Sequence, residues 1–393
     1  MFQEIRESES QHMLQTYKRA PILWERGHGV WLVDSQGQEY LDMAAGIAVN
    51  ALGYEHPAII EVLARPGLIH TSNLYYTRPQ VELAGLLCDN SFADKVFLCN
   101  SGTEANEGAI KFARKFGKDR RELVAFSDGF HGRTMGALAC TANPRYRQPF
   151  EPLIGGVRFA TYNQLDSVNL DGGVAAVIVE PIQGEGGVQP ASTEFLQGLR
   201  RMCDARDVLL IVDEVQCGLG RTGQLWAHQH DGIEPDIMTL AKPLGGGLPI
   251  GAILVNQKVA NSIEAGDHGS TFGGGPLVTR VAGNVLATIN QQTFLAQVVE
   301  TGQALEEALR RMVSRFDFVL EARGRGLMWG LGLDEKVPVA RLVEAGYKQK
   351  LVMLSSGRNT LRLLPPLILR PKHVEIFEKR LVAALEEVAL ALA

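Results

Sequence analysis

The chain has 393 residues, of which 46% are hydrophobic and 21% are charged, and its formal net charge is −5 at pH 7. This length and composition predict a globular protein with a large core and about two or three domains. Because the basic residues are scattered along the sequence, neither nucleic acid nor an anionic membrane is expected as a partner. Small molecules or a second copy of the chain are the favoured partners.

The cysteines and the N-terminus indicate the compartment. The five cysteines show no CxxC spacing, which argues against a disulfide framework and against a zinc site. The first residues are polar and acidic, and no apolar run approaches the roughly 20 residues that span a bilayer. We therefore expect a cytoplasmic protein that binds no metal and is neither exported nor anchored in a membrane.

The first predicted element is an antiparallel hairpin over residues 24–41. Its first strand contains the apolar run Trp31-Leu32-Val33, and the chain turns at residues 35–37 before the second strand. A hairpin of this kind does not continue the pattern of the middle of the chain, so we assign it to a separate, smaller unit.

The middle of the chain alternates short β-branched runs with longer helical patterns, which predicts a mostly parallel sheet covered by helices. A helix over residues 195–207 has apolar side chains at a 3.6-residue period and connects two of the strands. In such sheets, ligands bind at the carboxyl ends of the strands. The expected strands are residues 95–99, 122–127, 174–180, 208–213, 236–241 and 252–255.

The segment 100–106 lies between the first of these strands and a helix that runs to about residue 116. Gly102 lets the backbone approach a ligand closely, and the free amides of the helix form a cradle for a phosphate group together with the hydroxyls of Ser101 and Thr103. A serine or threonine at this position also caps a helix without any ligand. The position at a strand's carboxyl end favours the phosphate site.

The loop 127–134 follows the next strand. Phe130 or His131 is suited to stack on a planar cofactor, and Arg133 is suited to grip a carboxylate with two hydrogen bonds. Glycines on either side predict a tight turn that a ligand approaches. A structural histidine and a surface arginine are the alternatives.

A lysine at the start of a glycine run and an acidic pair carry the strongest chemical signal. Lys242 begins the run Lys-Pro-Leu-Gly-Gly-Gly, 29 residues after Asp213, which is followed by Glu214. A lysine amine forms an imine with an aldehyde cofactor only if it can lose its proton, which requires a partly desolvated site with positive neighbours. A buried carboxylate such as Asp213 keeps a pyridine nitrogen protonated, so that the ring becomes an electron sink. The pair predicts a Schiff-base enzyme, with a surface lysine beside a flexible loop as the alternative.

The C-terminal part of the chain predicts a smaller α+β unit. Residues 300–316 and 371–392 have the pattern of amphipathic helices, and they flank short strands at 326–333 and 360–363. Together with the hairpin near the N-terminus, they predict a small domain built from both ends of the chain. The expected division is 1–50 for the N-terminal segment of the small domain, 51–288 for the large domain and 289–393 for the C-terminal part of the small domain.

Six motifs occur in the order seen in the class III (subgroup II) aminotransferases, and the sequence resembles that family over nearly its whole length. The resemblance implies pyridoxal 5′-phosphate as the cofactor, the α/β fold type I of the aspartate aminotransferase kind, and a homodimer with active sites at the subunit interface. Within the family, residues 44–53 and 70–76 look most like the enzymes that act on acetylornithine in arginine biosynthesis. The six motifs are residues 101–105, 130–134, 180–187, 213–216, the Lys242 segment and 269–274.

The resemblance also implies a role for each matching residue. Lys242 would form the Schiff base and act as general acid and base, and Asp213 would pair with the pyridine nitrogen. The other implied cofactor contacts are Phe130 and His131 at the ring face, Gln216 at the ring hydroxyl beside Glu214 and Val215, Ser101, Gly102 and Thr103 at the phosphate, and Thr271 of the partner subunit.

Substrate residues follow from the same resemblance. Arg133 matches the arginine that binds the α-carboxylate of the ω-amino donor, Ser270 lies where the acyl group is contacted across the dimer, and Tyr17 is a further candidate at that end. Arg362 matches the arginine that binds the α-carboxylate of glutamate or 2-oxoglutarate. One site must accept a terminal amine and an α-amine in turn, so Arg362 must be hidden in one half-reaction and free in the other. Glu185 is similar to the residue that pairs with Arg362 and releases it.

Other substrates and one other class of protein are the alternatives. Related ω-aminotransferases act on succinylornithine, ornithine, an acylated lysine or 4-aminobutyrate. Ornithine aminotransferases carry a tyrosine near the place of Gly46 and Ile47, so the small residue here favours an acylated substrate. A regulator that binds pyridoxal phosphate would need an added DNA-binding module and a basic surface, which this sequence lacks.

One segment departs from the family pattern. Residues 58–69 are several residues shorter than the helix that the family usually has there. Pro66 and Gly67 end any helix early, so we expect altered packing near the substrate entrance.

Overall fold

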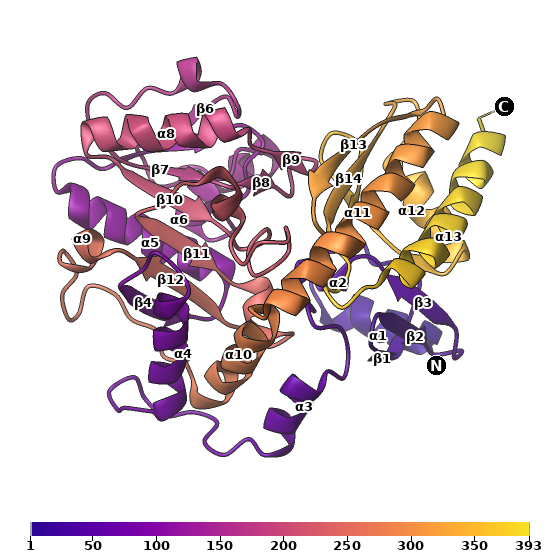
Figure 1. Cartoon of the computed structure of the whole chain (residues 1–393), viewed down its shortest axis with the longest axis horizontal. Coiled ribbons are helices and arrows are strands. Elements are labelled where there is room, and N and C mark those ends of the chain that lie inside the picture. Colours follow the sequence, from indigo (N-terminus) through magenta and orange to yellow (C-terminus); the bar gives the residue numbers. More distant parts are fainter. Residues whose placement is uncertain (1, 393) are drawn as a thin grey trace.

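The computed structural model describes residues 2–392, and within them a seven-stranded sheet forms the centre of the larger part of the molecule (Figure 1). All strands are parallel except β12, which is antiparallel to both of its neighbours. The mostly parallel sheet is therefore confirmed. Its order is β4 (Lys95–Cys99), β12 (Gly251–Val255), β11 (Ile237–Leu240), β10 (Leu209–Asp213), β7 (Val174–Val179), β5 (Glu122–Phe126) and β6 (Val157–Ala160).

Helices cover both faces of this sheet (Figure 1). Ile211 of β10 packs in the same core cluster as the buried side of α5 (Gly102–Gly117). The next residue, Val212, packs in a different cluster with α8 (Thr193–Arg206), the helix expected at 195–207. Successive side chains of a strand point to opposite faces, so a sheet buried on both sides requires the unbroken apolar runs seen in the sequence.

Three strands of the larger part were not expected from the sequence. β6 is an edge strand whose residues are mostly only half-buried, and β8 (Ile182–Gln183) pairs with β9 (Gln189–Pro190) in a two-stranded ribbon. Short or half-exposed strands lack the long apolar run by which the central strands are found. The remaining helices of this part are α4 (Arg78–Asp89), α6 (Met135–Ala139), α7 (Pro144–Arg147), α9 (Gln257–Ala260), α10 (Pro276–Ile289) and the short 3₁₀ turns η1 (Gln148–Phe150), η2 (Leu165–Ser167), η3 (Ala227–Asp231) and η4 (Lys242–Gly245).

A four-stranded sheet joins the two ends of the chain. The expected hairpin is confirmed by the antiparallel pairing of β2 (Trp31–Asp34) with β3 (Glu39–Asp42), and Asp34 closes its turn by accepting hydrogen bonds from the backbone of residues 36 and 38. β1 (Trp24–His28) adds a strand on one side. On the other side β3 runs parallel to β15 (Leu351–Val352).

A second four-stranded sheet contains the strands expected near the C-terminus. The strands expected at 326–333 and 360–363 are β14 (Met328–Leu333) and β17 (Thr360–Leu363). The other elements here are β13 (Val319–Arg325) and β16 (Leu354–Ser356), with the helices α11 (Gln292–Arg315), α12 (Val339–Lys348) and α13 (Pro371–Leu390).

Within residues 2–392, no helix combines the length and the apolarity needed to cross a bilayer.

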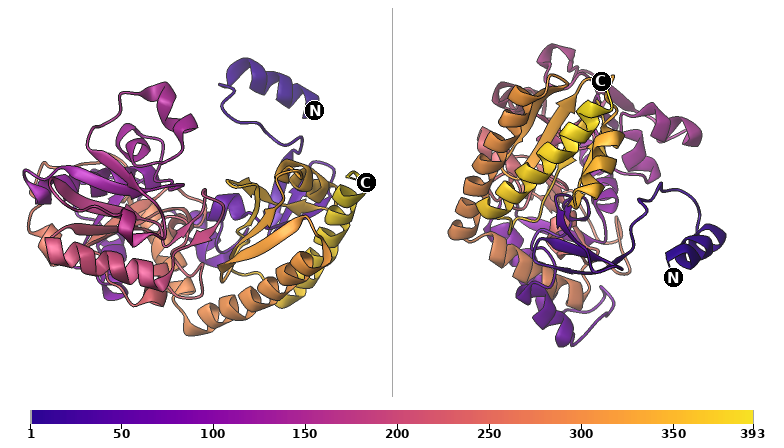
Figure 2. Two further views of the ribbon diagram at one scale, coloured as in Figure 1. Left: turned by 90° about the horizontal axis from the view of Figure 1, so that it is seen from above. Right: turned by 90° about the vertical axis from the view of Figure 1, so that its right-hand side faces the viewer.

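The segment before residue 70 contains three short helices. α1 (Phe2–His12) has no buried residue and stands away from the rest of the chain (Figure 2). α2 (Ala45–Ala48) is a turn whose four residues all have positive φ, between 48° and 67°. α3 (Pro57–Ala64) ends just before Arg65, as the proline and glycine that follow predict, and Arg280 donates to the carbonyl oxygens of Arg65 and Pro66.

Helix α11 packs closely against the turn between β13 and β14, and a glycine makes this contact possible. A Cβ added at Gly302 would lie 2.6 Å from the carbonyl oxygen of Gly326 and 2.9 Å from its carbonyl carbon. The backbone cannot rotate away as a flexible side chain can. The position therefore requires glycine although it lies inside a helix.

We predict that Gly302→Ala lowers the free energy of unfolding by about 1–3 kcal/mol through overpacking, although alanine normally stabilises a helix interior by about 0.5–1 kcal/mol relative to glycine. The matched control is Gly283→Ala in α10, where no atom lies within 4 Å of the added Cβ. The control should raise the thermal unfolding midpoint while Gly302→Ala lowers it. A rise in both midpoints would contradict the close packing of α11.

Candidate active site

A cavity of about 410 Å³ opens at the carboxyl end of the seven-stranded sheet. Its walls include residues that end or follow five of the strands, β4, β5, β7, β10 and β11. The sequence predicted chemistry at this edge of the sheet, and the structure gathers most of the candidate residues there. Those that line the cavity are Ser101, Gly102, Thr103, Phe130, His131, Arg133, Glu185, Asp213, Val215, Gln216 and Lys242.

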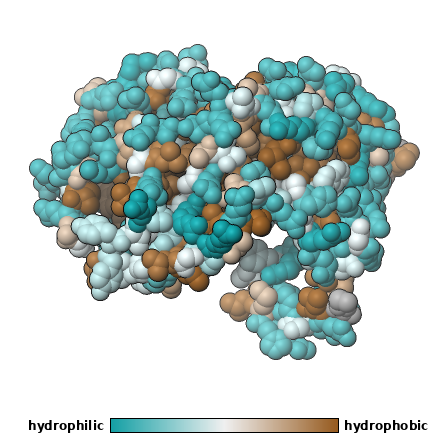
Figure 3. Space-filling model, turned by 60° about the horizontal axis from the view of Figure 1, so that its bottom comes forward, coloured by the Kyte–Doolittle hydropathy of each residue, from teal (hydrophilic) through white to brown (hydrophobic). Residues whose placement is uncertain are grey.

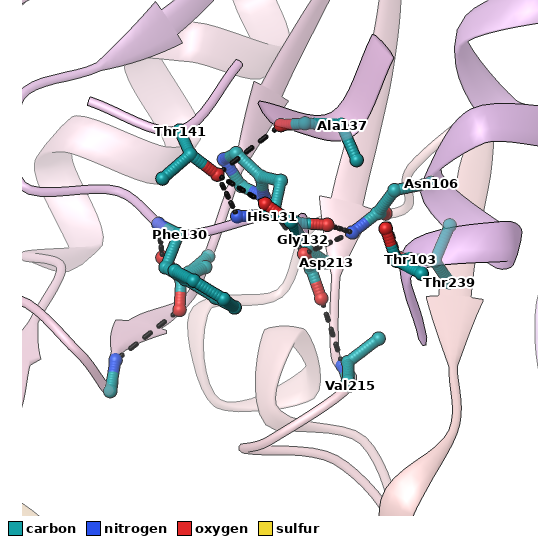
Figure 4. A network of polar contacts seen from close by, with 12 residues as sticks. Thr103, Asn106, Phe130, His131, Gly132, Ala137, Thr141, Asp213, Val215 and Thr239 are labelled. Atoms are coloured by element: carbon teal, nitrogen blue, oxygen red, sulfur yellow. Dashed lines mark hydrogen bonds and ion pairs between the residues drawn. The ribbon is translucent and has the colours of Figure 1, made fainter. Parts of the chain in front are cut away.

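Asp213 is buried at the end of β10 and is held by hydrogen bonds (Figure 4). Asn106 Nδ2 donates to its Oδ2 at 2.8 Å, and His131 Nδ1 lies 2.8 Å from the same oxygen. The backbone N–H of Val215 donates to Oδ1 at 3.0 Å. Burial alone would lower the pKa of His131, but the neighbouring Asp213 carboxylate raises it above its ordinary value. The aspartate is therefore fixed in orientation and stabilised as an acceptor.

Asn106 is a site residue that the sequence analysis missed. It is buried on α5, receives a hydrogen bond from Thr239 Oγ1 to its Oδ1 at 2.8 Å, and lines the cavity. The signal was available, because Asn106 follows Gly102 by four residues and so lies on the same side of the helix. A buried polar side chain on the core side of a helix requires partners, and here the partners are Thr239 and Asp213.

The N-terminus of α5 forms the end of the cavity that is suited to a phosphate group. Ser101 Oγ accepts from the backbone N–H of Glu104, so the serine caps the helix, which was the alternative role expected for it. Thr103 Oγ1 lies 2.7 Å from Thr134 Oγ1. A Cβ at Gly102 would lie 2.6 Å from Val215, so glycine is needed for the backbone to sit this close to the cavity wall. The first amides of a helix lack intrahelical partners and attract anions.

Lys242 begins η4 and lines the same cavity. Its φ of +36° is uncommon for a residue with a side chain, which indicates that the surrounding structure fixes its position. Burial lowers the pKa of Lys242, and the Arg362 guanidinium lowers it further, while Glu185 and Asp213 oppose the shift. A lowered pKa makes the neutral, nucleophilic amine more available near neutral pH.

Arg362 lies on β17 behind the cavity wall and is only 2% exposed. Its Nη1 donates to Glu185 Oε1 at 2.6 Å and to Gln216 Oε1 at 3.2 Å. Its Nε is buried without a hydrogen-bond partner in the part of the chain that the structure describes. The guanidinium is thus closed by Glu185, while its Nε remains available to a ligand.

Besides Arg362, four predicted residues do not line this cavity. The Glu214 carboxylate accepts from the backbone N–H groups of residues 227 and 228 and pairs with His228, so it supports the loop behind Asp213. Ser270 and Thr271 line a separate cavity of about 850 Å³. Tyr17 is 73% exposed in the arm that follows α1. Their predicted contacts with cofactor or substrate stay predictions.

Glu180 is a second residue that the sequence analysis did not assign. It is buried directly after β7, where it accepts hydrogen bonds from the backbone N–H groups of Phe130 and Gly184. Burial raises the pKa of Glu180 to about 7, while His131 opposes the rise and Asp213 adds to it. The sequence places this acid at the end of an expected strand, and that position could have identified it as a site residue.

In residues 2–392, no three His, Cys, Asp or Glu side chains are grouped to hold a metal ion.

Comparison with known proteins shows the family. The model of the class-III aminotransferases matches residues 13–385, so this chain belongs to that family. Mitochondrial acetylornithine aminotransferase of Alnus glutinosa is 49% identical over 95% of this chain and 85% of its own length. Succinylornithine transaminase of Yersinia pseudotuberculosis is 44% identical over 98% of this chain and 97% of its own. The ornithine aminotransferase structure from Toxoplasma gondii, which contains PLP, superposes with a TM-score of 0.96, with 29% identity over 100% of this chain and 95% of that one. These matches confirm the expected fold type.

The residues of the cavity fit pyridoxal 5′-phosphate, the cofactor on which class-III aminotransferases depend. The N-terminus of α5 is suited to the phosphate, and the buried, hydrogen-bonded Asp213 is suited to a protonated pyridine nitrogen. Phe130 offers an aromatic face, and Lys242 offers an amine of lowered pKa. The cavity thus has a suitable group for each part of the cofactor: its phosphate, its pyridine nitrogen, its ring face and its aldehyde.

The raised pKa of Glu180 predicts a pH dependence of stability. Between the ordinary pKa of 4.5 and the folded value of about 7, the folded protein keeps a proton that the unfolded chain has released, so stability falls as pH rises through this window. Glu180→Gln removes this loss, and the wild type should weaken relative to the variant by at most about 1.4 kcal/mol per pH unit.

The measurement is the thermal unfolding midpoint of both proteins between about pH 5 and 8. The amide introduced by Glu180→Gln has one acceptor fewer at every pH, so only the trend with pH is diagnostic. Glu375→Gln, at an exposed position of α13, is the control and should follow the wild type. A constant gap between wild type and Glu180→Gln would contradict the raised pKa.

Proposed function

We propose that this class-III aminotransferase transfers the terminal amino group of N2-acetyl-L-ornithine to 2-oxoglutarate, giving N-acetyl-L-glutamate 5-semialdehyde and L-glutamate in arginine biosynthesis. The observation that carries this proposal is the contrast between two arginines. Arg362 is buried and closed by Glu185, whereas Arg133 lines the cavity and, within residues 2–392, has no carboxylate at ion-pair distance. The site therefore offers one exposed and one hidden arginine for two substrates that present their carboxylates differently.

Succinylornithine is the second candidate donor. It carries an acyl group like acetylornithine, and the Yersinia relative bears its name. Ornithine, an acylated lysine and 4-aminobutyrate are further alternatives within the family. The left-handed turn at residues 45–48 carries only Ala, Gly and Ile, which supports a donor with a bulky acylated end.

The chain's own residues would hold the cofactor as follows. Lys242 would attach it, Asp213 would pair with the pyridine nitrogen while His131 holds the Asp213 carboxylate, and Phe130 would cover the ring. When bound, pyridoxal phosphate supplies a ring that accepts the electron pair released at the substrate carbon. Supporting contacts would come from Ser101, Gly102 and Thr103 at the phosphate and from Val215 and Gln216 at the ring.

Lys242 Nζ is the proposed base and acid of the reaction. With the amino donor bound, the neutral amine of Lys242 would take the proton from the reacting carbon of the donor and hold it for return in the same turnover. The lowered pKa of Lys242 supports this role, because a base must be neutral before it can accept the proton.

Glu185 and Arg362 are proposed to select between the two half-reactions. With the ω-amino donor, Glu185 keeps Arg362 closed, as the 2.6 Å contact allows. With glutamate or 2-oxoglutarate, the α-carboxylate replaces Glu185 and uses the unpartnered Nε as a second donor. Glu185 is 31% exposed, so it has room to leave without unfolding its loop.

We further propose a homodimer with shared sites. Thr271 of the partner subunit would reach the phosphate, and Ser270 of the partner subunit would contact the acyl group, with Tyr17 near that end. The support is that neither residue of the 270–271 loop lines the cavity of its own chain. Hydrophobic side chains reach the surface in several places on one face of the molecule (Figure 3). Among the exposed ones, Phe272 follows the 270–271 loop directly, and Leu74 and Tyr76 belong to the 70–76 segment.

The domain division and the location are proposals as well. All strands of the seven-stranded sheet lie between residues 95 and 255, which supports a large domain at 51–288. The two four-stranded sheets draw their strands from 24–42 and 319–363, which supports a small domain from both ends of the chain. The cysteines of the described residues are all free, which supports a reducing cytoplasm.

The donor assignment is tested by stopped-flow half-reactions with acetylornithine, succinylornithine, ornithine, acetyl-lysine and 4-aminobutyrate. We expect the highest kcat/KM with acetylornithine. Glu185→Gln should raise kcat/KM for glutamate relative to acetylornithine by about 10- to 100-fold, since a hydrogen bond to a charged group contributes about 1.5–3 kcal/mol. Preference for ornithine over both acylated donors, or equal losses for the two substrates in the variant, would overturn the assignment.

The shared site is tested by mixing two inactive variants. Lys242→Ala and Thr271→Ala homodimers should both be impaired, while subunit exchange should create heterodimers in which one site of the two is intact. We expect recovery of up to about a quarter of the wild-type activity from a random mixture of subunits. Exchange that is demonstrated by tagged subunits but restores no activity would show that Thr271 does not act across the interface.

A further inference from the structure

The Arg133 guanidinium rests on an aromatic ring. Its carbon Cζ lies 3.5 Å from the centroid of the Tyr146 ring and 5.8 Å from that of Phe130. No carboxylate of residues 2–392 makes an ion pair with it. The two rings meet edge to face, with centroids 6.2 Å apart at 86°. The arginine that faces the cavity is therefore oriented by aromatic contact.

The segment that carries Tyr146 is fastened to the loop that carries Arg133. The backbone N–H of Ala142 donates to the carbonyl oxygen of Gly129 at 2.9 Å. The backbone N–H of His131 donates to the buried Thr141 Oγ1, also at 2.9 Å. These bonds fix the start of the Tyr146 segment beside the Arg133 loop, so the stacking geometry does not depend on two independent loops.

Stacking leaves the useful part of the guanidinium free. A guanidinium that lies on a ring uses its flat face, whereas its N–H donors point outward in the plane and can bind a carboxylate through two hydrogen bonds. Without the ring, a long arginine side chain samples many rotamers, and ordering it on binding weakens affinity. The ring thus holds the donors ready before the substrate arrives.

We propose that Tyr146 is a positioning residue that selects donors with an α-carboxylate, because its ring holds Arg133 in the orientation that binds this group. The inference rests on the proposed function of Arg133 and extends it to a residue that does not touch the substrate. The ring, and not the hydroxyl, does the positioning, since within residues 2–392 the hydroxyl of Tyr146 makes no hydrogen bond.

The test compares two substrates that differ in one group. N-acetylputrescine is acetylornithine without its α-carboxylate, so it keeps the terminal amine and the acyl end. We expect Tyr146→Leu to lower kcat/KM for acetylornithine by about tenfold, mostly through KM, and to leave N-acetylputrescine within about twofold. Tyr146→Phe should keep the wild-type value for both substrates. Turnover of N-acetylputrescine also shows that each variant is folded.

Binding is measured separately from chemistry with N2-acetyl-L-norvaline, which has the acyl group and the α-carboxylate but no terminal amine. Its Kd for the holoenzyme, from calorimetry, should rise by about tenfold in Tyr146→Leu and stay unchanged in Tyr146→Phe. The matched control is Phe159→Leu, which removes the ring under Arg147, where Cζ lies 4.7 Å from the ring centroid. This control should leave kcat/KM for both substrates unchanged.

Arg133→Met separates failure of the inference from failure of the proposed function. If Arg133→Met affects acetylornithine and N-acetylputrescine equally, Arg133 does not bind the α-carboxylate and the proposed function is wrong at this residue. If Arg133→Met discriminates between them but Tyr146→Leu does not, the inference about Tyr146 is overturned. Discrimination by both variants, with rescue by Tyr146→Phe, supports it.

Discussion

The rest of the site depends on the burial of the Asp213 carboxylate at the end of β10. A buried carboxylate is tolerated only with hydrogen-bond partners. Here they come from three parts of the chain: Asn106 on α5, His131 after β5 and the backbone of Val215. Asn106 is in turn fixed by Thr239 on β11. One charge thus ties together α5, β11 and the loop that carries Phe130 and Arg133, and these same elements form the cavity wall.

The second constraint is the balance of charge around Lys242. Burial lowers the pKa of this amine and Arg362 lowers it further, whereas Glu185 opposes the shift, and Arg362 and Glu185 also bind each other at 2.6 Å. A substrate carboxylate that replaces Glu185 restores the same negative charge beside Arg362. The proposed change of partner therefore leaves the electrostatic surroundings of Lys242 nearly constant, so one lysine can serve both half-reactions.

The sequence allowed the fold and the edge of the sheet that carries the cavity to be predicted, because the central strands are continuous apolar runs ending in polar residues such as Asp213. It did not reveal β6, which is short and mostly half-exposed. The sequence placed Glu180 at a strand end and Asn106 on the inner side of a helix, but their roles depend on partners from distant segments that only tertiary packing brings together. The sequence also did not predict that Glu214 lies outside the cavity. Its hydrogen-bond partners, residues 227 and 228, lie in a 3₁₀ turn that was not expected from the sequence.

The parallel pairing of β3 with β15 has a consequence for how the chain is made. Strand β3 ends at Asp42, whereas its partner begins at Leu351, about 310 residues later. At a synthesis rate of about 5–20 residues per second, the edge of β3 stays unpaired for roughly 15–60 s while the seven-stranded sheet is completed. During synthesis the hairpin therefore has an unpaired edge at β3, and the sheet that joins both ends of the chain is one of the last parts to assemble.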